Sequence, residues 1–568
     1  MARRKNTESA VDYDDGWTLG LGGSTHGFSA ALAQGPDIRV AIEEERLSRV
    51  KYGFGNWFDD PTSRCVRYCL DAEGIKQADL NAVVSSDLFP YRAREFYSDL
   101  EFTTYPHHLT HAASACVMLP PAQQAAVIVY DGVGSARDVI PRNGQRRTQR
   151  ETFSFFRFEE NRLELLGTTY GEGFSEDTDY GDGFTNSLGL FYEIVSVLLG
   201  FGQYEAGKTM GLSAWGEPRY IDQLMPFFCL GKHYEKVLSF DPFGEFPSLV
   251  RDILDVGRGE FEVRADLAAT AQEIVNRVLL HCVERLAGQD YDVLCLVGGC
   301  ALNAVANGVL ATALPNGRRL LVPPYPHDAG LALGALWLHQ RGREMTFLGG
   351  PAAPMLSRPG RAYREADVHR AALRHYPQVV HDPSADTPED VADLLCTGEV
   401  IGVFQGRSEF GPRALGGRSI LTDCRSVDLR ERVNRLVKRR EPFRPLAPAV
   451  LAEHYDSYFT PPAAENPYMT VVARGTDRCR RNAAAALHID GSARVQSVGP
   501  DGDPFLRRVL IRFHQRTGVP VVLNTSFNGH GEPIVETPDH ALAGLLSLGL
   551  DALYAEGALF RPTKGLAR

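Results

Sequence analysis

The sequence predicts an α/β protein with two domains, the first of which is built from a duplicated unit. Its 568 residues are too many for one ordinary hydrophobic core. One pattern, a strand followed by a glycine turn and a strand hairpin, occurs twice in the first half. A stretch rich in Pro and Gly at 347–363 then separates that half from a second series of strands.

The first copy of the repeated pattern is WTLGLGGSTHGFSAALAQGPDIRVAIEEERLSR, at 17–49. It reads as a strand, a glycine turn, a second strand, a tight turn at Gly35-Pro36-Asp37 and a third strand. The second copy begins with AAVIVYDGVGS at 125–135 and continues with two strands in ETFSFFRFEENRLELLGTTYG at 151–171. Such a repeat is typical of the duplicated actin/Hsp70-like nucleotide-binding architecture, in which backbone N–H groups of these turns bind phosphate.

Two further glycine loops follow, LCLVGGCALN at 294–303 and VPPYPHDAGLALGAL at 322–336. Each is expected to open a helix, whose N-terminal N–H groups favour an anion. We therefore expect the first domain to contact a nucleotide through six residues: Gly132, Gly134, Lys208, Gly298, Gly299 and Asn303.

The domain boundaries follow from these patterns. We expect a mobile tail at 1–18, which has basic residues but no apolar stretch of the kind found in signal peptides. The first domain covers 19–346, a linker covers 347–384, and a second α/β domain covers 385–568. The strand signals of the second domain are VIGVFQG, SILTD and GVPVVLNTSF.

Composition excludes several classes of protein. Hydrophobic residues make up 44% and charged residues 23% of the chain, as in soluble globular proteins, and no apolar run is long enough to span a membrane. Ten scattered cysteines without a CxxC pair predict a reducing cytoplasm and no disulfide framework. A net charge of −11 argues against a nucleic-acid partner. The locally basic segment RERVNRLVKRREPFR at 430–444 suits a small anionic substrate instead.

A histidine pair is the strongest local signal for a metal. In YPHHLTHAASACVM, at 105–118, Pro106 suits the first position of a helix, which places His107 and His111 one turn apart on one face. Two imidazoles at that spacing can chelate one ion, although the stretch alone is equally typical of a polar helix start with ordinary histidines. A zinc-protease HExxH site is excluded because position 108 is His and not Glu.

One phosphate-binding motif is rejected. GFGQYEAGKTMG, at 200–211, fits the P-loop pattern GxxxxGK[ST]. The preceding SLGLFYEIVSVLLGF has a helical and not a strand period, and the following MGLSAWGEPRY is broken by Gly and Pro. Lys208 remains a phosphate ligand in another geometry.

Segments along nearly the whole chain together resemble the ATP-dependent O-carbamoyltransferases of natural-product and nodulation-factor pathways. They include HGFSAAL, EEERLSR, HHLTHAASA, YDGVGS, YEAGKTMGLSAWG, VGGCALN, HDAGLALGA, EFGPRALGGRSIL, NRLVKRREPFRPLAP, RVQSV and LNTSFNGHGEPIVETP. The resemblance implies a TsaD-like N-terminal domain and a YrdC-like C-terminal domain. It also implies transfer of a carbamoyl group from carbamoyl phosphate to a hydroxyl of a small molecule such as an antibiotic, with ATP split to AMP and pyrophosphate through carbamoyl-adenylate.

The resemblance also assigns residues. It implies a divalent metal on His107, His111, Asp131 and Asp328, and this mixed donor set suits Fe(II), with Mn or Zn as alternatives. Mg²⁺ would accompany ATP. It implies a site for carbamoyl phosphate and ATP on Arg413, Arg418, Asn434, Lys438, Arg440, Arg444, Arg494, Asn524, Ser526 and Asn528. The segment LRERVNRLVKR has apolar residues at 429, 433 and 436, which predicts an amphipathic helix with Asn434 and Lys438 on one face.

On the acceptor side the sequence offers less. His26, after the first glycine turn, is the candidate that binds or deprotonates the acceptor hydroxyl, and Lys51 matches a family lysine near it. Two other functions remain open: a tRNA threonylcarbamoyladenosine-type enzyme, and a non-catalytic actin/Hsp70-like nucleotide-binding protein. The acceptor and the choice between monomer and homodimer are not readable from the sequence.

Overall fold

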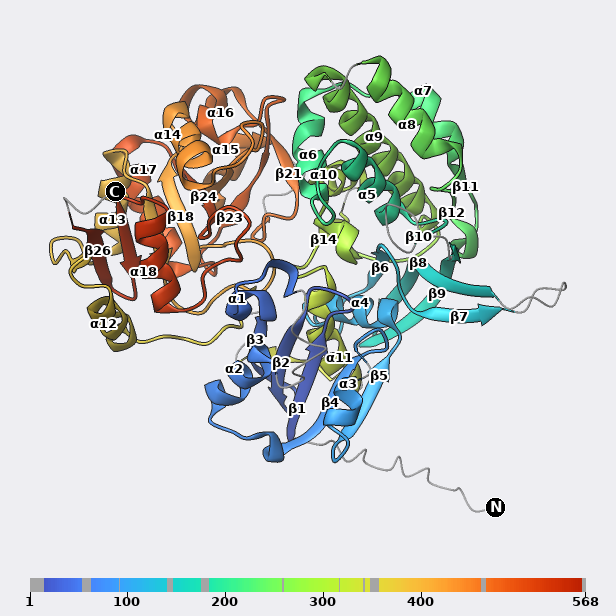
Figure 1. Ribbon diagram of the computed structural model, residues 1–568, viewed down its shortest axis with the longest axis horizontal. Coiled ribbons are helices and arrows are strands. Elements are labelled where there is room, and N and C mark those ends of the chain that lie inside the picture. Colours follow the sequence, from blue (N-terminus) through green and yellow to red (C-terminus); the bar gives the residue numbers. More distant parts are fainter. Residues whose placement is uncertain are drawn as a thin grey trace.

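The computed structural model describes residues 15–53, 63–90, 92–139, 147–174, 183–257, 260–315, 317–340, 343–347, 357–460 and 466–563. Figure 1 shows two sheets in the blue-to-green half of the chain and one large sheet in the orange-to-red half. The mixed α/β class is therefore as predicted.

The first sheet has the strand order β15-β3-β2-β1-β4-β5. Its strands are β1 (Trp17–Gly22), β2 (Ser29–Gln34), β3 (Asp37–Glu43), β4 (Leu80–Ser86), β5 (Glu101–Tyr105) and β15 (Thr346–Phe347). The second sheet has the order β10-β9-β8-β6-β13-β14, and β7 pairs with β8. Its strands are β6 (Ala125–Tyr130), β7 (Ala136–Val139), β8 (Arg147–Glu159), β9 (Arg162–Phe174), β10 (Gly183–Phe184), β13 (Val293–Val297) and β14 (Arg319–Leu321).

The predicted duplication is confirmed by the topology of these two sheets. In the first, β1 is antiparallel to β2, which is antiparallel to β3, and β1 is parallel to β4, which is parallel to β5. In the second, β6 has the same relation to β8 and β9 on one side and to β13 and β14 on the other. Each copy is thus a hairpin joined to two parallel crossovers.

Two helices, α4 (His107–Cys116) and α11 (Leu331–His339), pack between the two sheets (Figure 1). They approach closely because Gly334 has no side chain: a Cβ there would lie 2.0 Å from the carbonyl oxygen of Thr110. Both helices are rich in Ala and Leu, and their buried residues form one core with the inner sheet faces. This packing brings the start of α4 against the start of α11, and so places His107 and His111 beside Asp328.

The outer faces of the two sheets are also covered by helices. On the first sheet lies α2 (Arg64–Glu73), and on the second lie α5 (Leu188–Leu198), α8 (Glu245–Val256) and α9 (Phe261–Arg285). Other helices of this half are α1 (Glu44–Ser48), α3 (Arg92–Phe96), α6 (Ala206–Leu212), α7 (Ile221–Leu224) and α10 (Ala304–Ala313), and β11 (Cys229–Leu230) pairs with β12 (Leu238–Ser239). No helix among the described residues has the length and apolar character needed to cross a bilayer.

The C-terminal half is built on a sheet of order β16-β26-β25-β17-β18-β24-β19-β23. Its strands are β16 (Val379–His381), β17 (Ile401–Phe404), β18 (Arg418–Asp423), β19 (Ala447–Leu451), β23 (Gln496–Val498), β24 (Val521–Ser526), β25 (Ala552–Ala555) and β26 (Ala558–Pro562). A small sheet contains β20 (Phe459–Thr460), β21 (Val472–Gly475) and β22 (Ser492–Arg494). The helices are α12 (Glu365–Arg374), α13 (Pro388–Cys396), α14 (Val427–Arg432), α15 (Tyr455–Tyr458), α16 (Asp477–Asn482), α17 (Pro504–Thr517) and α18 (Pro538–Ser547). All three strands predicted from the sequence here are present as β17, β18 and β24.

The segment 347–384, predicted to be a linker, contains structure of its own. Within it lie α12 and β16, and β16 pairs with β26 of the C-terminal sheet. The segment 357–363 also lies against the first domain, where Pro359 accepts a hydrogen bond from Ala41 N–H at 2.9 Å. A three-residue strand carries too little periodicity to be recognised in the sequence. The expected tail at 1–18 lies mostly outside the described residues, and β1 begins at Trp17.

Candidate functional site

Four side chains converge where α4, β6 and α11 meet. His107 and His111 lie one turn apart on α4, Asp131 directly follows β6, and Asp328 directly precedes α11. One ligand atom from each lies within 4.8 Å of all the others. The Nε2 atoms of the two histidines are 3.2 Å apart, and Asp131 Oδ2 is 3.3 Å from His107 Nε2 and 3.5 Å from His111 Nε2. The chain therefore brings together the four residues expected to hold the metal.

These distances fit a single metal ion. Ligand atoms about 2.1 Å from one ion are separated by roughly 3.0–3.4 Å along the edges of an octahedron or tetrahedron. The Asp328 Oδ1 atom is 3.4 Å from His111 Nε2, and 3.8 Å from His107 Nε2. Imidazole and carboxylate donors in this combination suit Fe(II), Mn or Zn. The residues present therefore fit the expected group.

The electrostatics of the cluster favour a cation. Burial alone would raise the pKa of Asp131, but hydrogen bonds with the two histidines lower it well below its usual range. Burial alone would lower the pKa of His111, whereas Asp131 and Asp328 raise it to about 9. Two ionised carboxylates at a buried point thus hold a proton on His111, and a divalent ion would replace that proton.

A second layer of hydrogen bonds orients these ligands. Ser24 Oγ donates to Asp328 Oδ2 at 2.5 Å, and Gly299 N–H donates to Asp131 Oδ1 at 2.9 Å. Ser135 Oγ accepts from His107 N–H at 2.7 Å and donates to Asp87 at 2.9 Å. Sequence reasoning missed Ser24 and Ser135, although each belongs to a glycine turn that it had identified. Such partners fix the orientation of ligands and tune their basicity.

His108 points away from the cluster. Its Nδ1 lies 2.8 Å from Ser154 Oγ, and its backbone N–H bonds the Glu151 carboxylate at 3.3 Å. Burial, aided by the charge of His107, lowers the pKa of His108 well below its usual range. His108 is thus a neutral residue of the core, 0% exposed.

His26 and Lys51 have different neighbours. Burial lowers the pKa of Lys51, and Arg444 of the C-terminal half lowers it further. His26 lies near Asp328, and its ring is 4.7 Å from that of Tyr204. The Tyr52 hydroxyl donates to the Tyr204 carbonyl at 2.8 Å, and both tyrosines have positive φ angles, 64° and 61°. Non-glycine residues in this strained region concentrate at functional sites. Sequence reasoning gave no signal for the two tyrosines.

The predicted nucleotide contacts of the first domain are mostly engaged within it. Asn303 caps α10 by accepting from Ala306 N–H at 3.1 Å, and donates to Gln272 at 3.0 Å. Gly298 N–H donates to the Pro326 carbonyl at 2.8 Å, and Gly299 N–H donates to Asp131. The turn at Gly132 is open, since a Cβ there would meet nothing within 4 Å, whereas one at Gly134 would collide with His108.

Lys208 lies in the short helix α6, which follows the helix α5 and not a strand, so rejection of the P-loop is confirmed. Its Nζ binds Glu205 at 2.7 Å and Glu441 of the C-terminal half at 3.0 Å. Lys208 thus contributes to the contact between the two halves.

The predicted phosphate site is a cluster of cations. Four half-buried arginines, the buried Lys438 and, from the first domain, the exposed Lys51 form it; the arginines are Arg413, Arg440, Arg444 and Arg494. Arg444 lowers the pKa of every other member. In each case burial is the largest cause, and the pKa falls to about 9 for Arg440 and about 10 for Arg413. Within the described part of the chain, their only ion pair is that of Arg444 with Glu441, at 3.7 Å. Mutually repelling, poorly neutralised cations at one place indicate a site for a polyanion.

The segment carrying Asn434 and Lys438 differs from the expected α-helix. After α14, residues Val433–Val437 form a π-type turn, closed by the bond from Lys438 N–H to the Val433 carbonyl at 2.8 Å. The extra residue per turn separates the two side chains. Asn434 binds the Arg444 carbonyl at 2.9 Å and Arg440 Nε at 2.8 Å, whereas Lys438 reaches Asn528 Oδ1 at 2.7 Å and the Ser526 carbonyl. Such π-turns are frequent at functional sites.

Arg418 is not part of the cation cluster. It begins β18, and its guanidinium lies 3.7 Å over the ring of Phe404, completely buried. Its Nη1 donates to the carbonyls of Gly406, at 3.0 Å, and Gly417, at 3.1 Å. These bonds make Arg418 a support of its loop, while its Nε and Nη2 have no partner among the described residues. The expected contact of Arg418 with carbamoyl phosphate or ATP stays a prediction.

Asn524 and Ser526 lie at the end of β24, as predicted. Asn524 is fully buried and donates to Gln496 Oε1 at 2.9 Å, while its own Oδ1 has no partner among the described residues. Ser526 Oγ donates to Asn528 Oδ1 at 2.6 Å, beside Lys438. The end of β24 and the bonds of Lys438 to Ser526 and Asn528 thus place these predicted site residues near one another.

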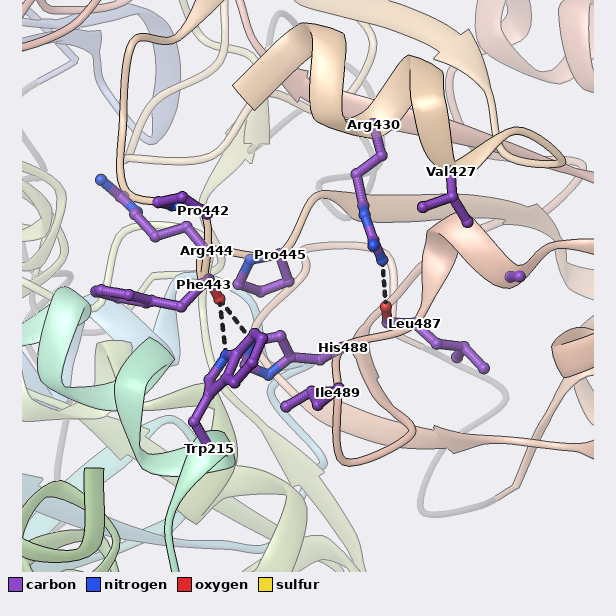
Figure 2. Close-up of a pocket in the computed structure, with 11 residues that line it drawn as sticks. Trp215, Val427, Arg430, Pro442, Phe443, Arg444, Pro445, Leu487, His488 and Ile489 are labelled. Carbon is purple, nitrogen blue, oxygen red and sulfur yellow. Dashed lines mark hydrogen bonds between the residues drawn. The ribbon is translucent and has the colours of Figure 1, made fainter. Parts of the chain in front are cut away.

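A pocket of about 240 Å³ lies next to the segment 442–445 (Figure 2). Arg444 lines this pocket and is also a member of the cation cluster. Figure 2 shows Trp215 and His488 both directed at the carbonyl of Phe443, to which Trp215 Nε1 donates at 3.4 Å and His488 Nε2 lies at 2.7 Å. Burial lowers the pKa of His488, so that its ring is neutral. The pocket offers flat apolar surfaces beside the cations.

Two family models match the sequence. The Carbamoyltransferase N-terminus model matches residues 92–337, and the Carbamoyltransferase C-terminus model matches residues 392–561. Nodulation protein NolNO of Sinorhizobium fredii is 30% identical over 581 residues, which cover 94% of this chain and 79% of the relative. Nodulation protein NolO of Bradyrhizobium diazoefficiens is 34% identical, with 66% of this chain and 69% of the relative covered.

Solved structures resemble the chain more distantly. Full-length HypF in its phosphate- and nucleotide-bound form has 14% identity and a TM-score of 0.36, covering 60% of this chain and 57% of that protein. The (R)-2-hydroxyglutaryl-CoA dehydratase component A of Acidaminococcus fermentans has 14% identity and a TM-score of 0.34, covering 57% of this chain and 98% of that protein.

Proposed function

We propose a reaction for this chain from one premise: it belongs to the carbamoyltransferase family. In the proposed reaction, carbamoyl phosphate supplies the carbamoyl group, ATP activates it as carbamoyl-adenylate, and a hydroxyl of a small natural product accepts it. The C-terminal half carries out the activation, and the four-residue cluster of the first half serves the transfer.

The observation that supports this proposal best is the cation cluster around Arg444. Carbamoyl phosphate and ATP are both anionic, and holding them together requires several fixed positive charges. Arg413, Arg440, Arg444 and Arg494 supply planar donors that match phosphate oxygens, and Lys438 adds a point charge. Their lowered pKa values mean that the charges are costly until an anion neutralises them. We therefore place the phosphates of both substrates here.

Activation proceeds in two balanced steps in this proposal. Water cleaves carbamoyl phosphate to carbamate and phosphate. A carbamate oxygen then attacks the α-phosphorus of ATP, forming carbamoyl-adenylate as pyrophosphate leaves. The arginines stabilise the charge that develops on the departing pyrophosphate. Lys438, held by Asn528 and Ser526, is placed to orient the carbamoyl end.

The pocket beside Arg444 is the place we assign to the adenine ring. Trp215, His488 and Pro445 offer flat faces for stacking, and the pocket adjoins the site assigned to the phosphates. The neutral His488 ring adds no charge to an already cationic region.

In the transfer step the acceptor hydroxyl attacks the carbamoyl carbon, and AMP leaves. His26, beside Asp328, receives the proton of the hydroxyl. A divalent ion held by His107, His111, Asp131 and Asp328 would supply a fixed positive charge that stabilises the leaving phosphate. Ser24 and Ser135 keep the ligands oriented through their hydrogen bonds. Lys51 lies between the two sites and binds the adenylate on its way.

The experiment that tests this proposal measures pyrophosphate. We expect the purified protein to release pyrophosphate and AMP from ATP only when carbamoyl phosphate is present. Release of ADP and phosphate instead would contradict adenylation. Stimulation by added tRNA, but not by small hydroxyl compounds, would favour the tRNA-modifying alternative, and absence of any dependence on carbamoyl phosphate would favour the non-catalytic one.

A further inference from the structure

The pair formed by Glu43 and Arg46 is the most deeply buried ion pair at the boundary between the two halves. Glu43 ends β3 and is 4% exposed, and Arg46 lies in α1 and is 0% exposed. Arg46 Nε donates to Glu43 Oε2 at 3.2 Å. Buried ion pairs gain little net stability, because desolvation offsets their attraction. Stability of the first domain is therefore a weak explanation for the pair.

The remaining bonds of the pair hold one residue of the C-terminal half by its backbone. Arg46 Nη2 donates to the Gly411 carbonyl at 2.6 Å, and Gly411 N–H donates to Glu43 Oε2 at 3.3 Å. Gly411 has a φ of 107°, and a Cβ at this position would lie 2.1 Å from the carbonyl oxygen of Pro324. The backbone at Gly411 is thus clamped between the ion pair and the segment that leads to Asp328.

Gly411 belongs to a loop, 409–418, that is also fixed from within. The Glu409 carboxylate accepts from Leu415 N–H at 2.6 Å and Gly417 N–H at 2.7 Å. Phe410 packs its ring 5.5 Å from that of Tyr325. Arg413 lies between the two anchors, at 411 and at 415–417, and joins the cation cluster through Arg444 and Arg494. The position of its guanidinium therefore depends on both anchors.

We propose that Arg46, together with Glu43, is a positioning residue for Arg413, so that the first half of the chain completes the anion site of the second half across their boundary. The positioning role depends on the proposed function in one respect: the anion that binds at this site is taken to be the phosphate of a substrate. Glu43 Oε1 also accepts a hydrogen bond from His327 Nε2 at 3.2 Å, so the same carboxylate contacts the segment of a candidate metal ligand. The pair therefore ties the loop of Arg413 to the segment of Asp328.

The test is the affinity for inorganic pyrophosphate, measured by calorimetry on the full chain. Arg46→Met keeps the length of the side chain and removes its hydrogen bonds. We expect affinity to fall about tenfold, the effect of about 1.4 kcal/mol lost in one charge-assisted contact. In the background of Arg413→Met the same substitution should change affinity less than twofold, because the residue through which it acts is gone. A structural defect would instead lower affinity in both backgrounds.

Arg49→Met is the matched control. Arg49 follows the same helix and donates across the same boundary to the carbonyls of Ile534, at 2.6 Å, and Pro533, at 2.7 Å, away from the loop of Arg413. We expect it to leave pyrophosphate affinity within threefold of the unmodified protein. If Arg46→Met does not fold, Arg46→Lys is used instead. We expect it to lower the affinity for pyrophosphate about threefold, and to have no such effect in the background of Arg413→Met.

The outcomes separate the two proposals. Unchanged affinity in Arg46→Met, an equal loss in both backgrounds, or no binding of pyrophosphate by the unmodified protein would each overturn the role of Arg46. Normal binding of pyrophosphate without any pyrophosphate release from ATP and carbamoyl phosphate would overturn the proposed function and leave the positioning role standing.

Discussion

Removing Arg444 should stabilise the protein when no anion is bound, and abolish most of its stabilisation by pyrophosphate. Arg444 is the member of the cation cluster whose charge acts on all the others. Its own pairing with Glu441, at 3.7 Å, is loose. The perturbation is Arg444→Met, with Arg444→Lys as the control that keeps the charge.

The magnitude follows from Arg440. A pKa lowered from 12.5 to about 9 corresponds to about 5 kcal/mol against its charged form. Burial is the larger cause and Arg444 the second, and solvent at this half-buried site screens both. We therefore assign about 1–2 kcal/mol to Arg444. With an unfolding entropy of about 2.1 cal/mol/K per residue, this would raise the unfolding temperature of the 568-residue chain by roughly 1–2 °C. Pyrophosphate at a hundredfold excess over its Kd should stabilise the unmodified protein by about 2.7 kcal/mol.

The assay is thermal unfolding with and without pyrophosphate. Without the anion, we expect Arg444→Met to unfold at a higher temperature than the unmodified protein. To reach the same rise in unfolding temperature on adding pyrophosphate, the variant should need at least ten times as much of the anion. Arg444→Lys should retain both the low midpoint and most of the shift. A lower midpoint in Arg444→Met together with an undiminished response to pyrophosphate would refute the reasoning, because the cluster would then be neither strained nor an anion site.

Three further predictions concern the other groups. His107→Ala or His111→Ala should remove the bound metal, measured by elemental analysis, and stop carbamoyl transfer while pyrophosphate release continues; full transfer by metal-free protein would contradict the assignment. Lys438→Met should abolish carbamoyl-phosphate-dependent exchange of labelled pyrophosphate into ATP but keep the metal, whereas a normal exchange rate would exclude Lys438 from the activation site. Burial lowers the pKa of His540 from 6.5 to about 4, so the unfolded chain binds this proton first and the fold loses stability as the pH falls from 6.5 to 4. His540→Asn should flatten the fall of the unfolding midpoint in this range, and an unchanged slope would show that His540 does not control it.

Local patterns predicted the elements of the fold that have strong periodicity. The hairpin of β2 and β3, the long pair β8 and β9, and the helix α4 all follow from alternation or helical spacing in short windows. The four candidate metal ligands are grouped by the family resemblance alone, because Asp131 and Asp328 lie far from the histidines in sequence. In the structure, the packing of α4 against α11, made possible by Gly334, brings the histidines to Asp328, and the end of β6 adds Asp131.

The features that were not predicted depend on contacts between distant residues. The π-type turn at Val433–Val437 differs from an α-helix by one hydrogen bond, and the side chains that favour it contact Arg444 and Asn528. The direction of Arg418 depends on where β18 begins, since a shift of one residue reverses the face. The bond between Arg46 and Gly411 joins residues separated by 365 positions, for which a single sequence has no local signal.

In the proposed reaction, a hydrolysable intermediate is made at one site and used at another, and a fixed boundary between the halves would protect it on the way. Hydrogen bonds cross this boundary at separate places: from Tyr68 to Glu536 at 2.6 Å, from Asn307 to the Thr470 carbonyl at 2.8 Å, and from Lys208 to Glu441. A hinge motion would break several of them at once and leave buried polar groups unpaired, each at a cost of about 1–3 kcal/mol. Opening is therefore disfavoured, and water is kept from the space between the sites. Arg444 helps to lower the pKa of Lys51, and Arg444 and Lys51 help to lower that of Lys438, so positive charges from both halves lie close together. In the proposed reaction, an anion leaving the arginines would therefore remain near positive charge until it reaches His26 and the candidate metal ligands.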